Sequence, residues 1–547
     1  MGKKSKPQSG LILEYEKVFK TNPPSDRLLL LSTTTKLELI GLICQINNIL
    51  SPRISTRFDY KLETQIKLLN FVLRLEPDPN KKNYVLSFLT GDAILFTRST
   101  NLWAITEILN SNIRSDQEDS KITSVDLWNF LQYYLCINSE ANKIKFDEDS
   151  AGSRAEKINH SILAFNEYFE NVDPIYTLYR GTKLLKYIDA SEEYGSQFKE
   201  YVNDISGHTL SEYLTEIAGI YFSNHSENDE FRFFFKTDSA KKIFESFSER
   251  EYPIKEKNIL EALHIRKSPF YKFGTNLYLL LDDKFLIEKS YDLIIWDFLF
   301  EKVLQNISDS NERISRIKKF KGFIGYFFES YVRENIERSF HFLKHPKPKL
   351  FSDLLVNGSE FGDIYIQKNK RLLIGEVKSS GISSKSKYGE TVTDLYNNDR
   401  EEFFKTHGLN QLVRNIENLF QTPSNYNDKL NFKKAHSIYP VMVTSERILT
   451  LGLFIQIFNE EFNKKIDRKK YAIHTIKPLI ILHISDLEFL EEYFYNRTID
   501  IFDFLDSHYK KYPIIIKLSM SYSSLSPKHG KHVTQEIISF CGNTLRS

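Results

Sequence analysis

Apolar residues in the first half of the chain recur every three or four positions. This spacing places them on one face of a helix, with polar residues on the other. Four such stretches occur between residues 27 and 137, and they begin at Leu37, Leu62, Leu102 and Val125. We therefore expect this part of the chain to consist of helices packed through their apolar faces.

Two polar segments, residues 138–153 and 223–230, interrupt this pattern and are typical of loops. Between them the spacing predicts helices at residues 158–169 and 210–221. No residue in this half stands out chemically. Its helices indicate recognition or assembly more than catalysis.

Past residue 269, short apolar runs alternate with turn signals and longer helical patterns. In order, they predict a lead-in hairpin of residues 276–281 and 284–287 around Asp282-Asp283, an apolar helix at 290–304 and a helix at 311–342. Ser308, Asp309 and Ser310 precede the last helix, and such residues cap helix N-termini. We place the start of a second domain between residues 270 and 311.

The stretch from residue 360 to residue 380 predicts a β-hairpin. Two apolar runs, residues 364–366 and 372–374, flank the polar turn Lys368-Asn369-Lys370. Apolar residues occupy both faces of the two strands. A strand pair of this kind is covered on both sides, as in a mixed α/β core.

Pairing outward from a two-residue loop at Asn369-Lys370 sets Asp363 opposite Glu376, with Cβ atoms roughly 5 Å apart. Lys378 shares their face because side chains alternate along a strand. Two facing carboxylates repel each other, so we expect a cation between them, either a divalent metal or Lys378 itself. The alternative is a cross-strand ion pair with no chemistry.

Further elements would complete a sheet with helices on its faces. The pattern predicts a helix at residues 399–420, strands at 437–444 and 479–484, and a helix at 486–495. Residues 349–356 would supply the first strand. The order is then helix, strand, hairpin, helix, strand, strand.

Composition and charge add less than the pattern does. A chain of 547 residues with 41% hydrophobic residues is long enough for about two to four domains. Its 74 Lys and Arg against 72 Asp and Glu give a net charge of +2, so no global basic field indicates nucleic acid. Residues 311–420 hold 19 Lys and Arg against 14 Asp and Glu, which mildly favours a polyanionic partner.

Cysteine usage and hydropathy bear on location. Cys44, Cys136 and Cys541 form neither a metal-ligand spacing nor a disulfide framework, which is typical of a reducing cytoplasm. No apolar run approaches the roughly 18 residues of a membrane span. The apolar run at residues 11–13 is too short for a signal peptide. We expect a cytoplasmic protein.

Asp363, twelve intervening residues, and Glu376-Val377-Lys378 at the end of an apolar strand resemble the signature of the PD-(D/E)xK phosphodiesterase superfamily, which includes restriction endonucleases. The resemblance covers about residues 313–495. It implies an αβββαβ core with Mg²⁺ or Mn²⁺ held by Asp363, Glu376 and the Val377 carbonyl, and with Lys378 in an orienting and electrostatic role. The superfamily usually has Pro where this chain has Gly362.

The resemblance also implies supporting residues. The string GYFFESYV puts Glu329 in the place of a helix acid that serves the metal, and the alternative is a surface glutamate paired with Arg333. Gln411 occupies the Gln of a Gln-x-x-x-Tyr pattern in which Asn415 replaces the Tyr. A basic loop at residues 381–388 suits a phosphate backbone, and it is equally typical of a solvated loop.

Other site classes lack their signatures. His341 and His345 could bind zinc from one helix, but Pro346 ends the helix there, so interaction with the helix dipole is favoured. The chain has no GxSxG elbow and no Walker-type loop, so it lacks the motifs that would indicate serine-hydrolase or P-loop ATPase activity.

The function expected from the resemblance is that of a metal-dependent endonuclease that hydrolyses DNA, in restriction or another anti-phage defence. Two alternatives stay open. One is a non-catalytic scaffold with a degenerate nuclease fold that binds nucleic acid or protein, and the other is an RNase. Many nucleases of this fold act as homodimers or with a partner subunit, and the sequence shows no diagnostic interface.

The expected fold class is α+β multidomain, with a mainly α-helical N-terminal region followed by an α/β restriction-endonuclease-like core whose central mixed sheet is flanked by helices. Its parts are a disordered basic arm (residues 1–26), a helical recognition or assembly region (27–270, with an internal boundary near 138–158), a nuclease-like domain with its lead-in hairpin and helix (271–500), and a C-terminal helix and tail (501–547).

Overall fold

The structure is a computed structural model. It describes residues 11–51, 58–90, 93–113, 126–141, 173–223, 233–237, 241–249, 262–342, 355–356, 359–360, 362–379, 400–421, 434–471, 473–512, 517–522 and 524–544. The predicted helix at residues 158–169 and the basic loop at residues 381–388 lie outside these residues.

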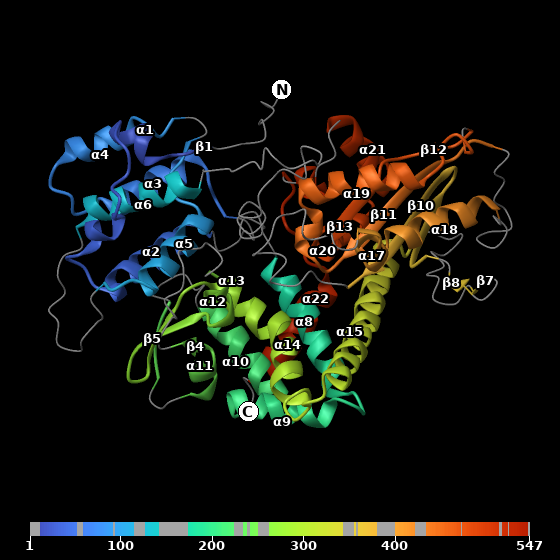
Figure 1. Ribbon diagram of the computed structural model, residues 1–547, viewed down its shortest axis with the longest axis horizontal. Coiled ribbons are helices and arrows are strands. Elements are labelled where there is room, and N and C mark those ends of the chain that lie inside the picture. The colour runs from blue at the N-terminus through green and yellow to red at the C-terminus, as the bar shows by residue number, and fades with distance from the viewer. Residues whose placement is uncertain are drawn as a thin grey trace. The chain divides into compact units, whose positions relative to one another are not determined.

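The chain divides into two compact units (Figure 1). Unit 1 holds the described residues up to Val303 together with residues 536–544, and unit 2 runs from Leu304 to Gln535. The division lies between residues 270 and 311, where the sequence places the start of the second domain, but it assigns residues 271–303, predicted as the lead-in of the nuclease-like domain, to unit 1.

Unit 1 consists mainly of helices. They are α1 (Tyr15–Phe19), η1 (Arg27–Leu31), α2 (Lys36–Leu50), α3 (Leu62–Val72), α4 (Pro79–Leu86), α5 (Arg98–Leu109), α6 (Leu127–Ala141), α8 (Pro174–Asp189), α9 (Gly195–Ser206), α10 (Leu210–Ser223), α11 (Lys242–Ser246), α12 (Ala262–Lys267), α13 (Asp283–Glu288), η3 (Lys289–Leu293), α14 (Ile294–Phe298) and η4 (Leu299–Val303). Strands β3 (Phe234–Lys236), β6 (Leu277–Leu280), β5 (Phe270–Gly274) and β4 (Ser248–Glu249) form a small sheet in that order.

Local sequence explains where several of these helices begin. Thr35 caps α2 in a capping box with Glu38, and Thr97 caps α5. Pro79 starts α4, where its missing N–H leaves no bond unmade. The expected packing of helices through apolar faces is confirmed for the described part of this half.

Two sequence-based expectations for unit 1 are wrong. Residues 11–26 are not a disordered arm, because Leu11–Ile12 form β1, which pairs in parallel with β2 (Ala93–Ile94), and α1 follows with Val18 fully buried. Residues 1–10 lie outside the described part. Both elements are short, so each contains too few apolar side chains to be predicted from its own sequence.

The lead-in hairpin also lies one strand earlier than predicted. Strand β6 pairs with β5, which precedes it, and Asp282 begins α13 by accepting a hydrogen bond from the Phe285 N–H at 2.9 Å. Aspartate favours turns and helix N-termini alike, so the sequence alone does not separate these two structures.

Unit 2 contains a mixed sheet and its covering helices. Its elements are α15 (Ser310–Ser339), β7 (Leu355–Val356), β8 (Ser359–Glu360), β9 (Ile364–Lys368), β10 (Arg371–Lys378), α17 (Arg400–Thr406), α18 (Leu409–Gln421), β11 (Ser437–Thr444), η7 (Arg447–Thr450), α19 (Gly452–Lys465), β12 (Thr475–Ile476), β13 (Ile480–His483), α20 (Ile484–Tyr495), α21 (Ile501–Lys511) and η8 (Leu518–Met520). The last helix, α22 (Lys531–Thr544), starts in this unit.

The sheet runs in the order β12-β11-β10-β9, and β13 also pairs with β11. Strand β9 is antiparallel to β10, whereas β11 is parallel to β10, β12 and β13. The expected mixed sheet and α+β class are therefore present. Strand β11 matches its predicted range of residues 437–444.

Helices cover both faces of the sheet that contains the hairpin strands. Tyr365, Leu372 and Ile374 pack in one apolar cluster with α18 and α19. On the opposite face Tyr439 of β11 contacts Phe502 of α21, with ring centroids 5.0 Å apart. Helix α21, predicted to lie outside the nuclease-like domain, thus packs on the same sheet.

Two other predictions for unit 2 differ from the structure. The helix predicted at residues 399–420 is two helices, α17 and α18, because Gly408 adopts a left-handed φ of +85°. In the expected first strand, residues 349–354 lie outside the described part, and β7 pairs with β8 instead of the central sheet. None of the described helices is long and apolar enough to span a membrane.

Candidate active site

The hairpin register is the one that the sequence predicts. Arg371 pairs with Lys368 and Gly375 with Ile364, with Asn369 and Lys370 between the strands. Asn369 adopts a φ of +57°, which asparagine tolerates better than most residues. Asp363 and Glu376 are the next residues outward from the last pair, Ile364 and Gly375.

Asp363 bonds to the backbone of the opposite strand. Its Oδ2 atom accepts a hydrogen bond from the Val377 N–H at 2.7 Å. The side chain thus replaces the backbone carbonyl that would accept this bond if β9 began one residue earlier. In a β-strand the N–H and C=O of one residue point to the same edge. The Val377 carbonyl therefore faces the Asp363 side of β10.

Glu376 lies at the centre of the candidate site. Its residue is 0% exposed, and its Oε1 atom accepts a hydrogen bond from the side-chain amide of Asn415 on α18. The Oε2 atom receives no hydrogen bond from the described part of the chain and lies 3.6 Å from the Lys378 Nζ atom. One oxygen is thus held by an amide, and the other faces a cation.

Burial raises the pKa of the Glu376 carboxyl well above its usual range. The Asp363 carboxylate raises this pKa further, and the Lys378 ammonium opposes the shift. Without a stronger cation, Glu376 therefore keeps its proton at a pH where an exposed glutamate has lost it. A bound divalent ion would compete with that proton.

The side chain of Lys378 packs against Gly408 on its way to the site. Its side chain is 23% exposed, and its methylene groups pass over Gly408, where a Cβ atom would lie 2.9 Å from both Cγ and Cε. The break between α17 and α18 therefore gives Lys378 its path. Gly408 is required here both for its φ of +85° and for the space beside it.

The backbone at Gly362 does not suit the proline that precedes the aspartate in the superfamily signature that this stretch resembles. Its φ is +29°, a conformation that the proline ring forbids. A Cβ atom there would lie 3.4 Å from the Asn415 Nδ2 atom and 3.7 Å from the Glu376 Oε1 atom. Glycine thus leaves a small open space next to the carboxylate.

These residues fit a hard divalent cation that keeps several water ligands. The donors are two carboxylates and a backbone carbonyl, which Mg²⁺ and Mn²⁺ prefer, and the Glu376 Oε2 atom is buried without a hydrogen bond from the described residues. The described residues contain no group of three or more His, Cys, Asp or Glu that could hold a metal. The site would therefore depend on water and phosphate oxygens for its remaining ligands.

The supporting residues have mixed outcomes. Helix α15 lies close to the end of β10. An added Cβ atom at Gly325 would be 3.2 Å from the Oγ atom of Ser379, which follows β10. Glu329, one turn further along α15, is exposed, and its role as a metal ligand stays a prediction. Gln411 is partly buried on α18, and its substrate contact likewise stays a prediction.

Asn415 is the site residue that the sequence reasoning missed. It is 0% exposed and lies one turn beyond Gln411 on α18. The available signal was a polar residue on the apolar face of a strongly amphipathic helix, between Leu412 and Leu419. The sequence pattern instead suggested that Asn415 lies on the polar side of this helix, in the place of a family tyrosine, and its complete burial shows that this expectation was wrong.

Of the two histidines considered as zinc ligands, only His341 lies in the described part of the chain. His341 lies after the end of α15, where its Nδ1 atom is 3.1 Å from the Arg338 carbonyl oxygen and its ring packs on Tyr495 at 4.4 Å. His345 lies outside the described residues. The contact with a terminal carbonyl agrees with the helix-end role favoured from the sequence.

A search of protein-family models, curated proteins and solved structures finds no match to this chain. The resemblance to the PD-(D/E)xK superfamily therefore depends on the residues and geometry described above.

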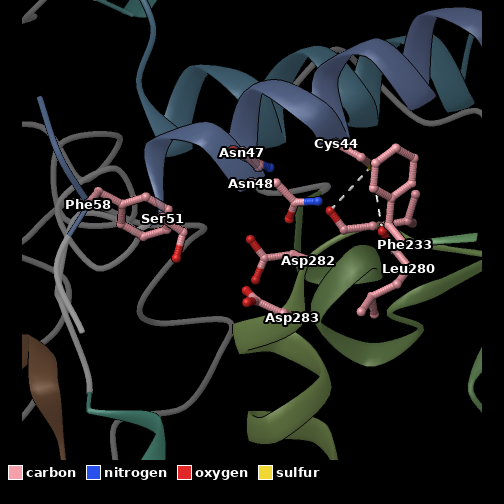
Figure 2. Close-up of a pocket in the computed structure, with 10 residues that line it drawn as sticks. Cys44, Asn47, Asn48, Ser51, Phe58, Phe233, Leu280, Asp282 and Asp283 are labelled. Carbon is pink, nitrogen blue, oxygen red and sulfur yellow. Dashed lines mark hydrogen bonds between the residues drawn. The ribbon is translucent and has the colours of Figure 1, made fainter. Parts of the chain in front are cut away.

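Unit 1 contains a cavity beneath α2 (Figure 2). Its volume is about 10 Å³, which suits one water molecule, and Cys44, Asn47 and Asp282 are among the residues that line it. Asp282 is held by a buried bidentate ion pair with Arg98, at 2.8 and 2.9 Å. This cavity is too small for a substrate, and the ion pair joins α5 to the start of α13.

Proposed function

We propose that unit 2 is a Mg²⁺- or Mn²⁺-dependent nuclease that hydrolyses phosphodiester bonds in DNA. The observation that carries this proposal is that Asp363 accepts a hydrogen bond from the Val377 N–H, next to the buried Glu376, while the Lys378 Nζ atom lies 3.6 Å from the Glu376 Oε2 atom. Structural ion pairs do not require two facing acids, one of them completely buried.

Each residue has a separate part in this proposal. Asp363, Glu376 and the Val377 carbonyl would hold the cation, which would supply positive charge beside the scissile phosphate. Lys378 orients the attacking water and stabilises the charge that develops on the phosphate. The path over Gly408 limits the positions of its ammonium group.

Exposed cations on α15 support a polyanionic substrate. On α15, Arg316, Lys318, Lys319 and Lys321 are exposed, and the same helix passes the end of β10 at Gly325. Such residues attract a phosphate backbone and make binding dependent on salt.

The complete burial of Glu376 favours a second candidate function. A carboxylate that is 0% exposed and bonded to Asn415 also fits a nuclease-like fold that binds nucleic acid without cutting it. In that case the carboxyl would stay protonated and no cation would bind.

Cleavage assays on the full chain separate these functions. Labelled duplex DNA, single-stranded DNA and RNA are each incubated with Mn²⁺ and the wild-type chain, Glu376→Gln or Lys378→Met. Asp503→Asn, an exposed acid on α21, is the matched control. We expect cutting of DNA that falls about 100-fold or more in the two site variants and not in the control.

Other results would change the assignment. Cutting of RNA alone would make the protein an RNase. DNA binding with no cutting by the wild-type chain would favour the second candidate. Cutting that persists in Glu376→Gln would contradict the proposed site.

A further inference from the structure

Asn415 is a buried amide on the apolar face of α18. Its neighbours one turn away, Leu412 and Leu419, are 0% exposed and belong to the apolar cluster beneath the sheet. A leucine at position 415 would suit that cluster better than an amide, which must be hydrogen-bonded when it is buried. The identity of this residue therefore points to its contact with Glu376.

The contact fixes one particular oxygen of Glu376. The Asn415 Nδ2 atom donates to Oε1, and Gly362 lies on the same side, where an added Cβ atom would be 3.7 Å from Oε1. Oε2 is the oxygen on the Lys378 side and has no hydrogen bond from the described part of the chain. The carboxylate is thus presented with Oε1 occupied and Oε2 available.

We propose that Asn415 is a positioning residue that holds the Glu376 carboxylate so that Oε2 faces the divalent cation. Groups that hydrogen-bond a metal ligand orient it and typically change metal affinity 10–100-fold when they are removed. This inference rests on the proposed function, and it adds a residue that the family pattern does not supply.

Metal affinity is the test, because it can be read without any cleavage. Isothermal titration with Mn²⁺ is carried out on the full chain and on Asn415→Leu, which keeps the number and branching of the side-chain heavy atoms but removes the donor. Asn415→Gln restores an amide donor on a longer side chain. We expect the Mn²⁺ dissociation constant to rise about 10–100-fold in Asn415→Leu and by less in Asn415→Gln.

Asn459→Ala is the matched control for a general loss of stability. Asn459 is also a buried asparagine of unit 2, but its amide donates to the Ile455 and Leu479 carbonyls, away from Glu376. This variant should unfold more easily and bind Mn²⁺ with the wild-type dissociation constant.

The outcomes separate this inference from the proposed function. Wild-type affinity in Asn415→Leu, together with lost affinity in Glu376→Gln, would overturn the positioning role and leave the proposed function in place. Wild-type affinity in Glu376→Gln, or no Mn²⁺ binding by the wild-type chain, would overturn both.

Discussion

Single residues determine whether the carboxylate pair can hold a cation. Asp363 is fixed by the Val377 N–H and Glu376 by Asn415, so neither depends on the cation for its position. Whether a cation can bind then depends on the charge of Glu376, because burial and Asp363 both raise its pKa and favour the neutral form. Its titration therefore reports the state of the site.

The Glu376 proton should appear in the pH dependence of stability. In the absence of metal, the folded chain keeps this proton above pH 4.5, where the unfolded chain has lost it, so stability falls as pH rises through the folded pKa. Glu376→Gln removes this loss. We expect the stability of the variant relative to wild type to increase as pH rises above 4.5 in urea titrations with EDTA.

Mn²⁺ should reverse that difference, because the ion binds only the deprotonated wild-type carboxylate. Parallel curves for wild type and variant, with and without Mn²⁺, would show that Glu376 neither titrates abnormally nor holds a cation.

His407 gives a second pH dependence, of different origin. Burial lowers the pKa of His407 from 6.5 to about 4. The unfolded chain binds this proton between pH 6.5 and 4 and the folded chain does not, so stability is lost as pH falls through that window. His407→Phe should remove a loss of about 3 kcal/mol between pH 7 and pH 4.

Urea unfolding at these two pH values measures the effect of His407→Phe. His341→Phe, at the exposed end of α15, is the control and should follow wild type. An equal loss in His407→Phe and wild type would mean that another group causes the acid sensitivity.

At the scale of elements, glycines shape the connections around the site. Gly408→Ala should cost about 1–3 kcal/mol, because alanine is strained at φ +85° and its Cβ would lie 2.9 Å from the Lys378 side chain. Displacement of Lys378 should also reduce cleavage. Gly452→Ala, where an added Cβ meets nothing within 4 Å, is the control. Equal unfolding midpoints for both variants would show that Lys378 does not need this path.

Helix α15 is the element expected to attract the substrate. The double variant Lys318→Glu/Lys321→Glu should weaken DNA binding about tenfold or more at 0.1 M salt and reduce its salt dependence. Lys510→Glu/Lys511→Glu on α21 changes the same charge in the same unit. If both double variants weaken binding equally in fluorescence anisotropy, the effect comes from net charge and not from α15.

How well an element could be predicted depends on how local its cause is. Strand β11 and the register of the β9–β10 hairpin follow from apolar runs and one polar turn, so the sequence was sufficient. The break at Gly408 and the helix start at Asp282 depend on distant packing, and both were misjudged. Asn415 was missed because its partner lies 39 positions away in the chain.

At the scale of the whole molecule, the chain forms two compact units, and the candidate chemistry lies in unit 2. Unit 1 is largely helical, and the cavity described there suits one water molecule. Recognition or assembly thus stays the prediction for unit 1, and anti-phage defence stays a prediction for the protein. The expected place of residues 349–356 in the central sheet was wrong for β7, because short strands carry little sequence signal.

Anomalous diffraction from crystals of the full chain grown with Mn²⁺ tests the central claim most directly. We expect a peak about 2.1 Å from the Glu376 Oε2 atom and from an Asp363 oxygen. A fully occupied Mn²⁺ elsewhere in the crystal, with no peak between these two carboxylates, would contradict it.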